Sequence, residues 1–95
     1  MKGYVVCVYK SISSEEKLKE YATKAKAAVE KHQGQFLIRG GRSITNEGDK
    51  SPRTIVIEFS SYDKANLFYN SKEYKEAHDV LKGHAIRHHQ TIEGA

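Results

Sequence analysis

Two short segments of this chain carry apolar side chains on both faces of the strand that each would form. Residues 4–9 read YVVCVY and residues 53–59 read RTIVIEF, so side chains that would point in opposite directions are apolar in both segments. A strand of this kind is covered on both sides, which is typical of the centre of a sheet. The two segments are therefore predicted to be central strands.

A helix is predicted after the first strand, which spans residues 3–10. Ser13 followed by Glu16 is a capping-box pattern, and apolar side chains then recur at steps of three and four as far as Val29. Gly34 is expected to end this helix in the left-handed conformation that glycine adopts readily.

The middle of the chain predicts a hairpin. The second strand begins at Phe36, and Gly40 and Gly41 are expected to form a bulge near its middle. Residues 46–52 have the composition of a loop, and the third strand follows. The remaining predicted elements are a helix from Ser60 or Ser61 to about Asn70, a helix that Ser71 caps and Gly83 ends, and a mostly polar edge strand over 85–92.

The resulting order is β-α-β-β-α-β, with the second helical unit broken in two. This order predicts an α+β ferredoxin-like fold, in which a four-stranded antiparallel sheet has helices on one face, and a single domain over residues 1–95. The other sheet face still carries apolar side chains, so it needs a cover. A second copy of the chain is the simplest cover, and a homodimer is therefore expected.

The composition excludes several classes of protein. Cys7 is the only cysteine, so internal disulfides and multi-cysteine zinc sites are excluded, and its apolar neighbours indicate a small buried side chain. The apolar run at residues 4–9 is too short for a signal peptide or a membrane span. A cytoplasmic protein with no membrane partner is therefore expected.

The net charge of +4 raises the question of nucleic-acid binding. The lysines of the first helix alternate with glutamates, which indicates a solvated face rather than a basic groove. The same order of elements occurs in RNA-recognition domains, which stack bases on aromatic side chains of the third strand. Ile55 and Ile57 lie on that strand here, so no nucleic-acid partner is expected.

Five segments together carry a family resemblance over nearly the whole chain. They are KGYVV near the start, HQGQFLIRGGR, IVIEFSSYDKA, FYNSKEYKEA and the terminal IEG. With these segments the chain resembles the family of domain of unknown function 1330, within the dimeric α/β-barrel superfamily. The resemblance implies a small homodimeric barrel without an assigned activity. The superfamily contains monooxygenases and isomerases of small aromatic or carbonyl compounds, and its haem-degrading members use a tryptophan, which this chain lacks.

The chain departs from that family at two positions. The resemblance implies a proline where this chain has Lys72, and an arginine in the last helical turn where it has Leu81. If that arginine helps to bind an anion in relatives, this chain binds a different ligand or none.

Arg39 and Glu58 are the first candidates for a catalytic site. Folding the hairpin about its loop brings residue 39 opposite residue 58 or 59, on the sheet face away from the helices. The pair could bind a carboxylate or enolate and supply a base, or it could be a structural ion pair that fixes the register or the dimer.

His78 is the third catalytic candidate. It lies on the apolar stripe of its helix with Tyr74, so it is expected to point inward or into a cleft, as a general base or as a hydrogen-bonded core histidine. Tyr69 is expected to pack its ring in the core and to send its hydroxyl to the rim. The candidate ligand-binding residues are Arg39, Gly40, Gly41, Tyr69 and His78.

No metal or other cofactor is expected. His88 and His89 would project from opposite faces of a strand, and His84 would lie roughly 13 Å from His88, so one ion could not bind them together. We therefore interpret these histidines as surface residues. Two functions stay open. One is a homodimeric small-molecule-binding protein or cofactor-free enzyme with a cleft between sheet and helices. The other is a non-catalytic dimeric module without a small ligand.

Overall fold

The computed structural model describes residues 1–95. Its strands are β1 (Gly3–Ile12), β2 (Gln35–Arg39), β3 (Thr54–Phe59) and β4 (Ala85–Glu93), and they form one antiparallel sheet in the order β2-β3-β1-β4. The two strands that the apolar pattern predicted to be central, β1 and β3, are the central pair. The ferredoxin-like α+β fold is thereby confirmed.

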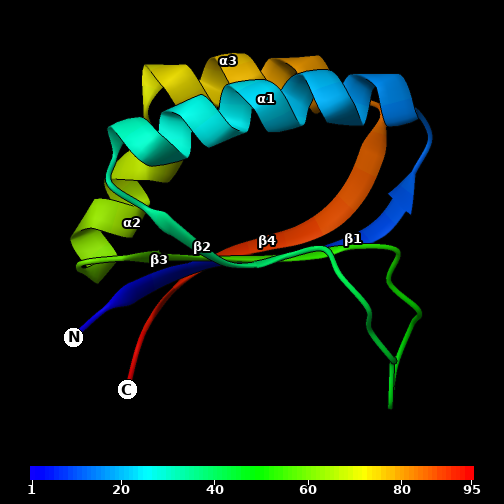
Figure 1. Ribbon diagram of the computed structural model, residues 1–95, viewed down its shortest axis with the longest axis horizontal. Coiled ribbons are helices and arrows are strands. Elements are labelled where there is room, and N and C mark those ends of the chain that lie inside the picture. The colour runs from blue at the N-terminus through cyan, green and yellow to red at the C-terminus, as the bar shows by residue number, and fades with distance from the viewer.

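Three helices lie together on one face of this sheet (Figure 1). They are α1 (Glu15–Lys31), α2 (Tyr62–Tyr69) and α3 (Lys72–Leu81). A serine caps each helix, and its hydroxyl accepts a hydrogen bond from a first-turn amide, as the sequence predicted for Ser61 and Ser71.

The predicted cap of the first helix was wrong by one residue. Ser14 is the cap, and its Oγ accepts from the amide of Lys17 at 3.1 Å. The Ser13 hydroxyl instead donates to the carbonyl oxygen of His84 at 3.0 Å. Ser13 therefore ties the start of α1 to the residue that precedes β4.

The predicted role of Gly34 at the end of α1 was also wrong. The left-handed residue is Gln33, with a φ of 60°. Gly34 is needed for space, because a Cβ there would lie 2.7 Å from a ring carbon of Phe59 and 2.9 Å from a methyl group of Val29. The end of α1 therefore packs directly on the sheet.

The bulge of β2 lies earlier than predicted. The register shifts between Phe36 and Ile38, and β2 ends at Arg39. Gly40 and Gly41 have φ angles of 74° and 94° and begin a loop that continues to residue 53. The two glycines therefore turn the chain out of the sheet.

The buried core lies between the sheet and the helices. Its members are apolar, and no polar or charged residue is buried as a whole. The core residues are Val5, Cys7, Tyr9, Leu18, Tyr21, Ala25, Ala28, Val29, Ile57, Phe59, Ala65, Phe68, Tyr74, Ala77 and Leu81.

The opposite face of the sheet has no helix over it (Figure 1). We call it the open face, and it includes Val8, Ile38 and Ile92, which are 36%, 46% and 44% exposed. Val6 pairs with Val56 in its middle, and both are half-buried. None of the helices has the length and apolar character that a membrane span requires.

Candidate functional site

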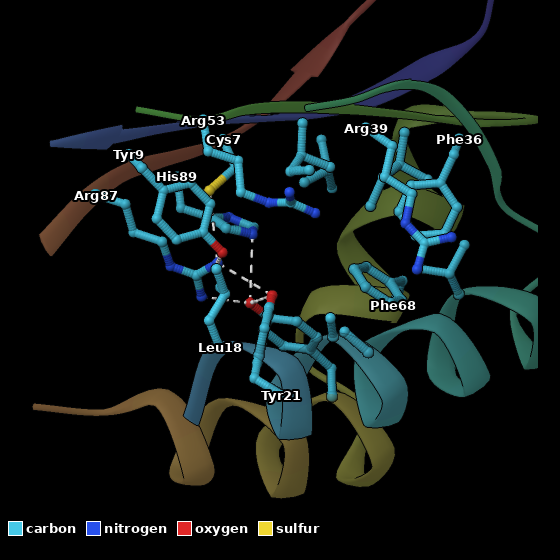
Figure 2. Close-up of a pocket in the computed structure, with 17 residues that line it drawn as sticks. Cys7, Tyr9, Leu18, Tyr21, Phe36, Arg39, Arg53, Phe68, Arg87 and His89 are labelled. Atoms are coloured by element: carbon cyan, nitrogen blue, oxygen red, sulfur yellow. Dashed lines mark hydrogen bonds between the residues drawn. The ribbon is translucent and has the colours of Figure 1, made fainter. Parts of the chain in front are cut away.

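Arg87 lies on β4 opposite Tyr9 of β1, and its side chain points between the sheet and the helices (Figure 2). Its Nη2 donates to the hydroxyl of Tyr74 at 2.7 Å, and its Nη1 donates to Tyr21 at 3.0 Å and to Tyr9 at 3.3 Å. The guanidinium carbon also lies 4.9 Å from the ring centre of Tyr21. Arg87 thus makes hydrogen bonds to three phenol groups, which come from β1, α1 and α3.

No carboxylate neutralises Arg87. The ion pairs of this chain are made by lysines and by His32, and none includes an arginine. Burial raises the pKa of Tyr9 to about 12 and also raises the pKa of Tyr21 and of Tyr74. The phenols are therefore protonated at neutral pH, and they offer Arg87 oxygen dipoles rather than a formal negative charge.

The guanidinium of Arg87 stays charged in this setting. Burial lowers its pKa, but attraction to Tyr21, Tyr74 and Cys7 outweighs burial, so that the pKa of Arg87 is raised. A desolvated cation without a formal counter-ion attracts anions strongly, because the surrounding dielectric is low.

His89 also lies on β4, and its side chain is on the same face of the sheet as that of Arg87. Its Nε2 lies 3.4 Å from the Tyr74 hydroxyl oxygen, and its ring centre lies 5.0 Å from that of Tyr69. Burial, followed by the positive charge of Arg87, lowers the pKa of His89 to about 3. A neutral imidazole, which is a weak base in this setting, therefore adjoins the cluster. The interpretation as a surface histidine is wrong for His89, whereas His88 is exposed.

The cavity beneath these groups measures about 30 Å³, which is enough for ordered water. Its wall is mostly apolar. Besides the hydroxyls of the three tyrosines, the polar side chains on it are Arg39, Arg53, Arg87 and His89, with no aspartate or glutamate. Arg87 also borders two open grooves of about 380 Å³ each. The cavity is thus a narrow apolar space with positive charge at its edges.

Two predicted site residues lie in one of these grooves. His78 and Tyr69 line it together with Arg87 and His89. The His78 ring stacks on Tyr74 at 6.1 Å between ring centres, and burial followed by the charge of Arg87 lowers its pKa. Tyr69 is 36% exposed, so its ring lies at the rim rather than in the core.

The predicted pair of Arg39 and Glu58 does not exist. Arg39 lies opposite Ile55, three residues from Glu58, and it lines the cavity on the helix side. Glu58 lies on the open face, where it accepts a hydrogen bond from the Tyr4 hydroxyl at 3.0 Å. The loop begins at Gly40 rather than near residue 46, and an odd shift of register moves a side chain to the other face.

Gly40 and Gly41 differ in their relation to the cavity. A Cβ on Gly40 would lie 3.0 Å from Nη1 of Arg53, so the missing side chain leaves space for that guanidinium. Gly41 has no atom within 4 Å of the corresponding position. Of the two candidates, only Gly40 shapes the cavity edge.

Arg87 and its three phenols were not predicted as a site from the sequence. Tyr9, Tyr21 and Tyr74 belong to apolar sequence patterns, which predict buried positions, and all three lie in the core. Leu81, where the resemblance implied an arginine in relatives, is buried and borders the groove that Arg87 shares. No group of three or more histidine, cysteine or acidic residues is arranged to hold a metal ion.

Residues 2–95 match the sequence profile of the family described as domain of unknown function (DUF1330), which confirms the resemblance. A search of the curated proteins gives no significant match.

Several solved structures share the fold at low sequence identity. RPA0582, a protein of unknown function from Rhodopseudomonas palustris, is 10% identical with a TM-score of 0.77, over 99% of this chain and 82% of that one. A dimeric protein of unknown function with a ferredoxin-like fold from Bacteroides fragilis is 17% identical with a TM-score of 0.65, over 98% and 96%. An ethyl tert-butyl ether D family protein from Bacillus halodurans is 11% identical with a TM-score of 0.62, over the full length of both chains. These likenesses show the fold alone.

Proposed function

We propose that this chain, which belongs to the DUF1330 family, is a homodimeric protein that binds a small organic molecule through an anionic or carbonyl oxygen at Arg87. The observation that carries the proposal is a partly buried guanidinium that has three phenol oxygens around it and no carboxylate. Structural arginines inside proteins are ordinarily paired with an acid.

The phenols add donors to this site. The Tyr21 and Tyr74 hydroxyls share a hydrogen bond, and Tyr74 can pass its own hydrogen to His89. The Tyr9 hydroxyl accepts from Arg87, and its hydrogen has no acceptor among the protein groups. A ligand oxygen near Arg87 would therefore receive a hydrogen bond from Tyr9 as well as the charge of the guanidinium.

The same groups could support proton transfer on a carbonyl compound. Arg87 would stabilise the negative charge that develops on the carbonyl oxygen, as oxyanion sites do. Tyr74 would pass its hydroxyl hydrogen to His89 and take up the proton that leaves the substrate, because its oxygen lies 3.4 Å from the imidazole nitrogen and is held in place by Arg87. Burial and then the charge of Arg87 keep His89 a weak base, and a bound anion would offset the second of these two effects.

The homodimer in this proposal rests on the open face. Its apolar side chains have no cover within one chain, and a second copy would bury them. The Bacteroides fragilis protein of the same fold is described as dimeric.

A second candidate function is a non-catalytic dimeric module. The observation in its favour is that Arg87 already makes hydrogen bonds to three oxygens, around a cavity of about 30 Å³. On this reading Arg87 is a structural link between β4 and the helices.

A thermal-shift screen of small carboxylic acids and carbonyl compounds separates the two candidates. Binding predicts stabilisation of the wild type, by about 2.7 kcal/mol at a hundred times the dissociation constant. Tyr9→Phe should keep the fold and lose most of this ligand-dependent shift, because it removes the free donor. If no acid or carbonyl compound raises the melting temperature at millimolar concentration, the module is favoured and the binding proposal is wrong.

A further inference from the structure

Three arginines stand in a row across the helix-facing side of the sheet. Arg39 lies on β2, and Arg87 lies on β4 opposite Tyr9. Arg53 lies between them, because the Tyr9 amide donates to its carbonyl oxygen at 2.9 Å just before β3 begins. β2 and β4 are three strand spacings apart, which is about 14 Å. Figure 2 shows Arg87 and Arg39 on opposite sides of the cavity, with Arg53 between them.

None of these arginines meets a negative charge. The cavity wall contains no aspartate or glutamate, and none of the ion pairs in the chain includes an arginine. The side chains of Arg39 and Arg53 also make no hydrogen bond to a protein acceptor, in contrast to Arg87. The donors of both are therefore available to a ligand.

The backbone fixes where Arg53 projects. Its amide donates to Ser51 Oγ at 3.2 Å, and its carbonyl oxygen accepts from that same hydroxyl at 2.9 Å. The Gly40 amide donates a hydrogen bond to the Thr54 carbonyl oxygen at 2.9 Å, and the missing side chain of Gly40 leaves the space that the Arg53 guanidinium occupies. The loop thus places a cation at the cavity without an acid to balance it.

Arg39 is placed by a different contact. Its guanidinium carbon lies 4.6 Å from the centre of the Phe36 ring, and Phe36 also lines the cavity. A cation over an aromatic face keeps its hydrogen-bond donors free at the ring edge. Arg39 and Phe36 together therefore form a mouth that is apolar on the inside and positive at the rim.

The space between the charged ends is apolar. Val5 and Ile57 form the sheet side, and Leu18, Ala25 and Phe68 form the helix side. We infer that this cavity takes an apolar molecule with an acidic group at each end, one held by Arg87 and the other by Arg53 and Arg39. This inference rests on the proposed function and narrows its ligand to a class of dicarboxylic or similar diacids.

The narrowness of the cavity sets a condition for entry. A volume of about 30 Å³ holds only small molecules such as water, so a longer ligand must displace side chains at the mouth. Arg39 is exposed, and Arg53 and Phe36 are half-buried, so these are the groups that can swing aside. Their movement would also wrap the guanidinium groups around the second acid.

Calorimetry with chain-matched probes tests this inference. The probes are 1-hexanol, hexanoate, hexanedioate and octanedioate, titrated into the wild type at low ionic strength. We expect hexanoate to bind more tightly than 1-hexanol through Arg87, and the better-fitting diacid to bind about threefold to tenfold more tightly than hexanoate, as expected for partly exposed charge pairs. Arg39→Gln and Arg53→Gln should each reduce the ratio of diacid affinity to hexanoate affinity.

Arg42→Gln is the matched control. Arg42 is exposed on the same loop and does not line the cavity, and its loss changes the net charge by the same amount. It should keep the advantage of the diacid, which excludes a general effect of charge. If the wild type binds hexanoate but gains nothing from a second acid, this inference fails and the proposal for Arg87 stands. If neither acid binds, both fail.

Discussion

The hydroxyl oxygens of Tyr21 and Tyr74 lie 2.9 Å apart, although 53 positions separate them in the chain. Their rings meet edge to face at 6.2 Å, and Arg87 donates to both hydroxyls. Tyr21 lies on α1, Tyr74 on α3 and Arg87 on β4. The three residues therefore join both long helices to the edge strand through hydrogen bonds in a largely apolar interior.

Tyr74→Phe should destabilise the fold by about 1–3 kcal/mol, because it removes one acceptor of Arg87 and the hydroxyl that bonds Tyr21, and leaves both with fewer partners in a buried network. Urea unfolding monitored by circular dichroism measures the change. Tyr62→Phe is the control, because Tyr62 is 42% exposed on α2 and makes no hydrogen bond through its hydroxyl. Equal stabilities for the two variants would show that the network contributes nothing to the fold.

His89 should make the protein sensitive to acid. Its folded-state pKa of about 3 lies below the ordinary value of 6.5, so the unfolded chain binds a proton first as the pH falls. The stability that neutral His89 contributes is therefore present above pH 6.5 and is lost toward pH 3, by up to about 1.4 kcal/mol per pH unit. The pKa of His78 is also lowered, so His78 should add to the loss of stability as the pH falls.

His89→Gln tests this dependence, because glutamine keeps a hydrogen-bond acceptor and does not titrate. Urea unfolding at about pH 7.5 and about pH 4.5 should show a smaller loss of stability for His89→Gln than for the wild type. His88→Gln is the neighbouring control on the open face and should change the loss much less. An acid dependence of His89→Gln equal to that of the wild type would contradict the expectation.

The fold followed from local patterns because each pattern has a physical cause within a few residues. The doubly apolar β1 and β3 could only be central, and Ser61 and Ser71 precede helices whose first amides need an acceptor. Arg87 was missed for the opposite reason. Its strand reads as polar, and only the packing of α1 and α3 brings two phenols to it.

The register of the β2–β3 hairpin could not be predicted from local sequence patterns either. The loop composition of residues 46–52 suggested a turn centred there, but the chain leaves the sheet at Gly40, and β3 starts at Thr54. The composition of a loop does not fix its length, and a shift of three residues placed Arg39 on the wrong face in the prediction. Arg39 was therefore predicted to pair with Glu58, whereas it lines the cavity.

A double-mutant cycle checks the corrected register. Arg39→Ala and Glu58→Ala should have additive effects on unfolding, because their side chains lie on opposite faces without a shared partner. Tyr4→Phe and Glu58→Gln should not be additive, because the Tyr4 hydroxyl donates to Glu58. Coupling in the first cycle and none in the second would restore the pairing that the hairpin originally suggested.

Val56→Asp should break the proposed dimer. Val56 lies opposite Val6 in the middle of the open face, and a carboxylate there would be buried without a partner when a second copy covers the face. Light scattering at micromolar concentration should give twice the chain mass of 10.8 kDa for the wild type and the single mass for Val56→Asp. Leu67→Asp, at a 59% exposed position on α2, should remain dimeric. A monomeric wild type would contradict the homodimer proposal.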